Sequence, residues 1–322
     1  MSDAMIYAIA SGKGGVGKTT TAINLTAAFA AGGRSSVVVD TDLGMATLAS
    51  ALGGVEGPTL YDVLAEEASV AEATYEGDGF AFVPGGGTLD EYADADPGGL
   101  SGVVETLEES FDVVVLDVGA GLSHDTLVPL GLADEILLVS TPENAALESA
   151  ERVRELSERL DTPVTGLVLT RVTEANERAT EAVEAAVGTP VLAVVPEDEV
   201  VYESAAIGTA VVTNARKSPV TTAYLDLAEA LCDRIGEDLR AVGSSPEEGS
   251  GETVPAGLAD PEPTREVAGS GSESEDSEEG ATDSTSDESS TGTDHEDDAG
   301  VENADDEDDG RSRGLFSRLF GR

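Results

Sequence analysis

A glycine-rich stretch near the N-terminus, Ser11–Thr20, has the residue types and the spacing of a phosphate-binding loop. Its sequence, SGKGGVGKTT, matches the pattern G-x-x-x-x-G-K-[ST], with Lys18 and Thr19 at the last two positions. The glycines let several backbone N–H groups point at one anion, the lysine suits the β- and γ-phosphates, and the threonine hydroxyl suits Mg²⁺. We therefore predict that a nucleotide is bound by Gly12, Lys13, Gly14, Gly15, Val16, Gly17, Lys18, Thr19 and Thr20.

The segments on either side of this loop support the interpretation. Met5–Ala10 is apolar and predicts a buried strand, and Lys18–Ala31 predicts a helix whose N-terminus faces the phosphates. The alternative is a glycine-rich turn with no ligand. A complete motif between a strand and a helix argues against that alternative.

Aspartates stand at the ends of two further predicted strands. Asp40 and Asp42 lie at the carboxyl end of Val37–Asp40, and Asp117 closes the apolar run Val113–Asp117. A carboxylate near the γ-phosphate can orient a water molecule in line with the scissile bond, and an aspartate that closes an apolar run is the expected second magnesium element. Paired aspartates after a strand are also common helix-start residues. Their position directly after the phosphate-loop helix favours the catalytic interpretation.

The loop also carries a second lysine, Lys13, which an ordinary phosphate loop does not need. With this lysine the loop KGGVGKT resembles that of the MinD/ParA ATPases. The resemblance implies that Lys13 reaches across a dimer interface to the partner subunit's nucleotide, and that Asp42 positions the attacking water. It implies ATP and Mg²⁺ as cofactors, the catalytic residues Lys13, Lys18 and Asp42, and the metal-site residues Thr19, Asp40 and Asp117.

The same resemblance places three later residues near the base, and two positions depart from the family pattern. Thr170 stands before Arg171 where the family commonly has an asparagine that recognises adenine, and Pro196 opens a segment similar to the family's I-P-E-D. Gly119 replaces the proline of D-x-P-A-G. We expect this glycine to loosen the switch loop that senses the γ-phosphate and to affect hydrolysis more than binding.

Apolar runs alternate with helical patterns through residues 1–242. Short continuous runs rich in Val, Ile and Leu are typical of strands buried on both faces of a parallel sheet. The predicted fold is a doubly wound, mostly parallel α/β sheet. Its strands are Met5–Ala10, Val37–Asp40, Phe80–Val83, Val113–Asp117, Ile136–Ser140, Val164–Thr170 and Val191–Val195, and its helices include Glu143–Leu160, Glu174–Val187 and Val220–Ile235.

Composition restricts the class of protein. The chain has 322 residues, a formal net charge of −48 and one cysteine, Cys232, which excludes a thiolate metal site within one chain. It shows neither a signal-peptide pattern nor an apolar run of about 20 residues that would span a membrane. Lysine occurs only at three positions, and acid is spread along the whole chain. This pattern favours a halophilic protein over one with a local acidic binding surface, and it disfavours direct binding to DNA.

Three segments are predicted: an ATPase domain at 1–242, a disordered acidic linker at 243–310 and a terminal helix at 311–322. The last segment, RSRGLFSRLFGR, has four arginines and no acid, and its apolar residues fall on one face of a helix. This is the pattern of an interfacial membrane anchor or a partner-docking helix, and it resembles the C-terminal membrane-targeting helix of MinD proteins. The residues predicted to enter the membrane are Leu315, Phe316, Leu319 and Phe320.

The leading hypothesis is a MinD-like ATPase. ATP would drive homodimerisation, the dimer would attach to the inner face of the cell membrane, and hydrolysis would release it into the cytoplasm. Such a cycle would position a division site or a polar assembly, together with a protein regulator or cargo that the sequence does not identify. The alternatives are a ParA-like chromosome or plasmid partitioning ATPase, which needs a basic DNA-binding face, and a nucleotide-sensing membrane adaptor with little turnover.

Overall fold

The structure, a computed structural model, describes residues 4–42, 44–86, 96–121 and 124–243. The side chains of residues 124–125 and 235–243 lie outside this description. Apart from Gly243, the predicted linker at 243–310 and the predicted helix at 311–322 also lie outside the described residues. The proposed division of the chain into three segments therefore stays a prediction.

The core of the fold is an eight-stranded sheet with the strand order β3-β4-β2-β5-β1-β6-β7-β8. Every neighbouring pair is parallel except β3 and β4, so the predicted doubly wound, mostly parallel α/β fold is confirmed. The strands are β1 Met5–Ala10, β2 Ser36–Thr41, β3 Tyr75–Gly77, β4 Phe80–Val83, β5 Val113–Val118, β6 Glu135–Ser140, β7 Val164–Val172 and β8 Val191–Pro196.

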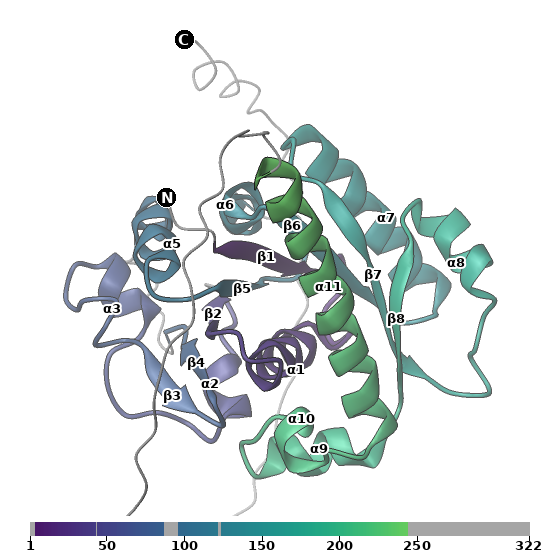
Figure 1. The fold of residues 1–322 in the computed structure, drawn as a ribbon, viewed down its shortest axis with the longest axis horizontal. Helices are drawn as coiled ribbons and strands as arrows, with labels where there is room; N and C mark the ends of the chain where they lie inside the picture. The colour runs from purple at the N-terminus through teal and green to yellow at the C-terminus, as the bar shows by residue number, and fades with distance from the viewer. Residues whose placement is uncertain (1–3, 43, 87–95, 122–123, 244–322) are drawn as a thin grey trace, which may run out of the picture. The chain divides into compact units, whose positions relative to one another are not determined.

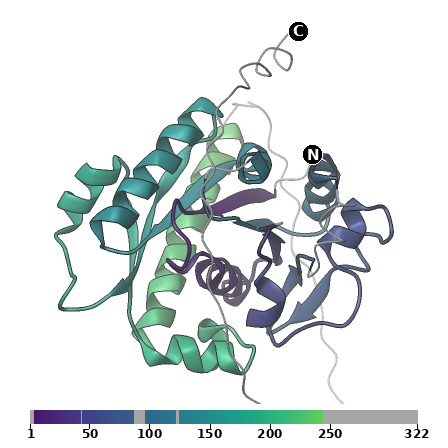
Figure 2. The same cartoon turned by 180° about the vertical axis from the view of Figure 1, so that it is seen from behind.

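Helices cover both faces of this sheet (Figures 1 and 2). Helices α1, α10 and α11 pack on one face, and α3, α5, α7 and α8 pack on the other. The helices are α1 Lys18–Ala31, α2 Leu48–Ala51, α3 Leu60–Leu64, α5 Leu100–Glu108, α6 His124–Leu132, α7 Asn144–Arg159, α8 Thr180–Val187, α9 Glu199–Ala206, α10 Val211–Asn214 and α11 Pro219–Gly243, with a 3₁₀ turn, η1, at Pro97–Gly99. No helix among the described residues combines the length and apolar character needed to cross a bilayer.

The central strand explains why the predicted strands are continuously apolar. In β1, Ile6 and Ala8 pack into the core on one face, and Tyr7 and Ile9 pack into the core on the other. Successive side chains of a strand point to opposite faces, so a strand covered on both sides needs apolar residues at every position. Strand β1 thereby holds the loop that follows Ala10 in the middle of the sheet.

The structure corrects three sequence-based expectations. Strand β3 was not predicted, because it is only three residues long and none of them is buried. Its signal was the Asp78-Gly79 pair, whose φ angles of 55° and 89° make the tight turn to β4. Helix α8 begins at Thr180 and not at Glu174, because the Asn176 side chain accepts a hydrogen bond from the Thr173 N–H at 2.6 Å and closes a turn there. Helix α11 continues to Gly243, beyond the predicted end.

Candidate nucleotide-binding site

The glycine-rich loop connects β1 to α1 at the carboxyl edge of the sheet. Gly15 and Gly17 have φ angles of 76° and 96°, in the left-handed region that favours glycine. Gly12 is required for a different reason. A Cβ atom there would lie 2.2 Å from the Ser149 carbonyl oxygen of α7. The loop therefore needs glycine both to turn and to pack against α7.

Lys18 and Thr19 begin α1 beside a buried carboxylate, Asp117, at the end of β5. Burial raises the pKa of Asp117 to about 6, against the opposing effects of the Lys18 charge and a hydrogen bond with Thr19. Its Oδ1 atom is buried and has no hydrogen-bond partner within the described part of the chain. A buried carboxylate oxygen without a partner is costly. A cation, or a water molecule bound to one, would remove that cost.

Asp40 lies beside Asp117 on the neighbouring strand, β2, and is fully buried. Its Oδ2 atom accepts backbone hydrogen bonds from Thr47 and Leu48 at 2.8 and 2.9 Å, and its Oδ1 atom accepts one from Asp42 at 3.2 Å. Burial and the charge of Asp117 raise the pKa of Asp40 to about 7 in spite of these bonds. Asp40 therefore fixes both ends of the loop between β2 and α2.

These residues fit Mg²⁺ bound together with a nucleotide better than a metal held by protein alone. No group of three or more His, Cys, Asp or Glu side chains in the described ranges could hold a metal ion. Mg²⁺ commonly takes one or two protein ligands and completes its shell with phosphates and water. Thr19 borders the phosphate pocket, and the buried Asp117 carboxylate is hydrogen-bonded to it from behind, while Asp40 anchors the adjoining loop.

Asp42 is half-buried at the start of that loop and borders the phosphate pocket. Its Oδ1 atom accepts a hydrogen bond from the Met45 N–H at 3.1 Å. A Cβ atom on Gly119 would lie 3.2 Å from the same oxygen, closer than ordinary van der Waals contact. The glycine that replaces the family's proline therefore leaves room for the Asp42 carboxylate against the loop after β5.

Thr47 is a site residue that the sequence reasoning missed. Its hydroxyl lies 3.0 Å from the Thr19 hydroxyl, so it contacts the predicted metal residue directly. Thr47 is also the N-cap of α2, yet its side chain makes no capping hydrogen bond. A threonine at an N-cap normally caps the helix. Its place after the Asp40–Asp42 pair was the only signal in the sequence.

Lys13 lies on the surface of the loop with 49% of its side chain exposed. Its Nζ atom is 3.5 Å from a carboxylate oxygen of Glu143, which directly precedes α7, and that same oxygen accepts a hydrogen bond from Thr141. An exposed ion pair of this kind contributes little to stability. Lys13 is therefore free to exchange this partner for another anion.

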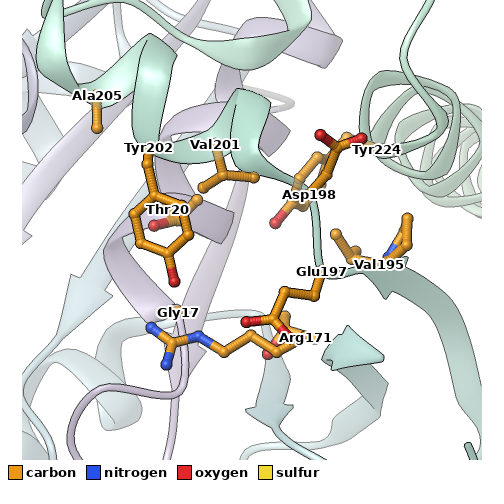
Figure 3. A pocket seen from close by; sticks show the side chains of 12 residues that line it. Gly17, Thr20, Arg171, Val195, Glu197, Asp198, Val201, Tyr202, Ala205 and Tyr224 are labelled. Carbon is orange, nitrogen blue, oxygen red and sulfur yellow. The ribbon is translucent and has the colours of Figure 1, made fainter. Parts of the chain in front are cut away.

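A second pocket opens beside the phosphate loop and is lined by the predicted base-binding residues Thr170, Arg171 and Pro196 (Figure 3). It shares Gly17, Thr20 and Arg171 with the phosphate pocket, so the two form one continuous surface. Its remaining lining residues are Val195, Glu197, Asp198, Val201, Tyr202, Ala205 and Tyr224. The sequence reasoning missed the contribution of α9, because nothing in the spacing indicates that this helix folds over the loop.

Thr170 is buried and turned toward the phosphate loop. Its hydroxyl lies 2.6 Å from the Val16 carbonyl oxygen and 3.2 Å from the Ser140 carbonyl oxygen, to which it donates. It thus ties the loop to β6 and β7. The expected direct recognition of adenine by this residue stays a prediction.

Comparison with known proteins agrees with this geometry. A family model described as the CobQ/CobB/MinD/ParA nucleotide binding domain matches residues 7–211. An uncharacterized ATP-binding protein of Methanocaldococcus jannaschii is 37% identical over 232 residues, which cover 71% of this chain and 88% of the relative.

Two solved structures are similar in both sequence and fold. The cell division ATPase MinD of Pyrococcus furiosus has a TM-score of 0.68 and 35% identity, covering 73% of this chain and 100% of that one. The septum site-determining protein MinD of Pyrococcus horikoshii, complexed with Mg-ADP, has a TM-score of 0.68 and 32% identity, covering 73% and 98%.

Proposed function

This chain belongs to the MinD/ParA family of P-loop ATPases, and we propose that it is a MinD-type ATPase whose ATP-bound dimer attaches reversibly to a membrane. The observation that carries the ATPase part of the proposal is a complete phosphate loop beside a buried aspartate, Asp117, one of whose oxygens has no partner among the described residues. The similarity to a MinD complexed with Mg-ADP supports ATP and Mg²⁺ as the cofactors of this site.

Each side chain of the site has its own role in phosphoryl transfer. Lys18 neutralises charge on the β- and γ-phosphates, and Thr19 and Asp117 would hold Mg²⁺, directly or through water. When bound, Mg²⁺ supplies positive charge that stabilises the transferring phosphoryl group. Asp42 orients the attacking water, and Asp40 keeps Asp42 in place through the backbone of the loop. Catalysis then rests on positioning and electrostatics and needs no histidine base.

The dimer is proposed from Lys13. Its ammonium lies at the surface, and within the described part of the chain its one ion pair is the exposed contact with Glu143. A second subunit that presents a nucleotide phosphate would offer a stronger, charge-assisted partner. Two subunits related by a two-fold axis would make this contact twice.

Lys13→Ala should weaken the ATP-bound dimer about 10- to 150-fold for each lost contact, because a hydrogen bond to a charged group contributes about 1.5–3 kcal/mol. Nucleotide binding by the monomer should change much less. Light scattering with a nonhydrolysable ATP analogue in high salt measures the dimer. Glu143→Gln is the matched control: it frees Lys13 from its pair in the same chain and should leave the dimer at least as stable. A fully dimeric Lys13→Ala variant would remove the basis for this interface.

Membrane attachment is proposed from residues 311–322, which lie outside the described residues. A large apolar side chain contributes about 1.5–3 kcal/mol when fully buried, so partial burial of Phe316 and Phe320 in one helix gives weak binding. Two helices on one dimer act together through effective concentration. Attachment would then depend on ATP, and hydrolysis would release the protein to act elsewhere, in a process that positions a division site or a polar assembly.

Phe316→Asp combined with Phe320→Asp should abolish co-sedimentation with liposomes at high salt, even with the ATP analogue bound. The charged side chains cannot enter the apolar layer, whereas salt already screens the arginines. Replacing Arg318 and Arg322 with glutamine is the control and should have a smaller effect. If the phenylalanine variant still sediments with the liposomes, the segment is a protein-docking helix and not a membrane anchor.

A further inference from the structure

Two planar side chains face the pocket beside the phosphate loop from opposite walls. Tyr202 comes from α9 and Arg171 from the end of β7, and the ring and the guanidinium point toward one another (Figure 3). Tyr202 is 58% exposed, which is unusual for a tyrosine on a helix that packs into a domain. The ring therefore borders the pocket without filling the core.

The backbone aims Arg171 into this position. Between Leu169 and Val172 of β7 the register with β8 shifts, because Thr170 and Arg171 stand opposite the single residue Val195. Arg171 has a φ of 52°, a left-handed conformation that is costly for a residue with a side chain. Bulges next to functional sites turn side chains toward a ligand. Here the bulge turns Thr170 inward to the phosphate loop and Arg171 outward to the pocket.

Arg171 also has no competing side-chain partner in the part of the chain that the structure describes. Within the described residues its guanidinium makes no ion pair, although the pocket is also lined by Glu197 and Asp198. The Asp198 side chain is already used, because it accepts a hydrogen bond from the Val200 N–H at the start of α9. An unpaired guanidinium and an exposed aromatic ring are both groups on which nucleobases stack.

From these observations we propose that Tyr202 and Arg171 form a base clamp, in which Tyr202 stacks on one face of the nucleotide's base and Arg171 on the other. This inference rests on the proposed function and adds a specificity residue to it. The Thr170 hydroxyl donates its proton to the carbonyl oxygens of Val16 and Ser140 and therefore has no proton to donate to the base, whereas both faces of the base are open to stacking in the clamp. A larger purine ring gains more from stacking than a pyrimidine, so the clamp favours purine nucleoside triphosphates.

Equilibrium binding of ATP, CTP and inorganic tripolyphosphate to the full chain, with Mg²⁺ in high salt, tests the clamp. Tyr202→Ala should weaken ATP binding about 5- to 150-fold, the range found when a base-stacking aromatic is replaced by alanine. Tripolyphosphate, which has no base, should bind to the variant as it does to the parent chain. The preference for ATP over CTP should shrink. Tyr202→Phe keeps the ring and should bind ATP within about twofold of the parent chain.

Ile207→Ala is the matched surface control. Ile207 follows α9 directly and is 64% exposed, but it does not line the pocket, so ATP binding should be unchanged. Unaltered ATP binding by Tyr202→Ala overturns the clamp, because it would show that the exposed ring does not contact the base. An equal loss for ATP and tripolyphosphate also overturns it, because the variant would then have damaged the phosphate loop. A parent chain that binds neither compound would reject the ATPase proposal itself, and the clamp with it.

Discussion

Replacement of Lys18 by alanine should weaken ATP binding by about 10²- to 10⁴-fold. The lysine begins α1 at the phosphate loop, where its charge meets the β- and γ-phosphates and already acts on the buried carboxylate of Asp117. Removing one partner of such a desolvated charge pair costs about 3–5 kcal/mol, which corresponds to this loss of affinity. Equilibrium binding of a labelled ATP analogue provides the measurement.

Lys217→Ala provides the matched control for this experiment. Lys217 is exposed between α10 and α11, and it is the chain's one lysine outside the phosphate loop. The Lys217→Ala substitution removes the same charge from a chain with a net charge of −48, so any general electrostatic effect on an anionic ligand appears in both variants. Equal affinities in the two variants would show that Lys18 does not bind phosphate and would reject the site.

The phosphate loop and its two flanking elements could be predicted from the sequence to the residue. Met5–Ala10 and Lys18–Ala31 have the bounds that were predicted. The reason is that their signals are local: a continuous apolar run, glycines required by the turn, and a helix that must start where the N–H groups meet the anion. The bounds of the other predicted strands agree with the observed ones to within two residues for the same reason, whereas β3 was not predicted.

Features that depend on distant segments could not be predicted. The pair between Lys13 and Glu143 joins residues 130 positions apart, and no spacing rule connects them. Tyr202 reaches the pocket only because α9 folds over the phosphate loop. The expected role of Asp40 at the metal stays a prediction. The hydrogen bonds by which its Oδ2 atom holds the backbone of the next loop could not be predicted from the sequence.

Asp117→Asn should have two opposite effects. It should stabilise the nucleotide-free protein at neutral pH, and it should remove the stabilisation that Mg²⁺ adds in the presence of ADP. Burial raises the pKa of Asp117 from 3.8 to about 6, so the folded protein favours the protonated form. The ionised carboxylate therefore lowers the free energy of unfolding. This loss is absent below the pKa of the unfolded chain, grows as the pH rises from about 4 to 6, and is complete above that range. Between pH 4 and pH 7 the parent chain should therefore lose about 1–3 kcal/mol that the variant does not lose.

Chemical unfolding at the two pH values, without nucleotide and in high salt, measures this difference. Asp226→Asn is the matched control. Asp226 is exposed on α11, and its replacement removes one carboxylate from the same acidic chain. The control should follow the parent chain at both pH values. If Asp117→Asn shows the same change in the free energy of unfolding as the parent chain and the control, the Asp117 carboxylate ionises in the folded protein as easily as in water.

The same variant should lose the stabilisation that Mg²⁺ adds in the presence of ADP. In the parent chain the cation would satisfy the Asp117 oxygen that has no partner among the described residues, so it offsets the burial of the negative charge. Asparagine has no charge to offset, and its amide binds Mg²⁺, directly or through water, more weakly than a carboxylate does. Thermal unfolding with ADP, with and without Mg²⁺, should therefore show a clear shift for the parent chain and for Asp226→Asn, and almost none for Asp117→Asn. A full Mg²⁺-dependent shift in Asp117→Asn would place the metal elsewhere and leave the unpaired oxygen without a function.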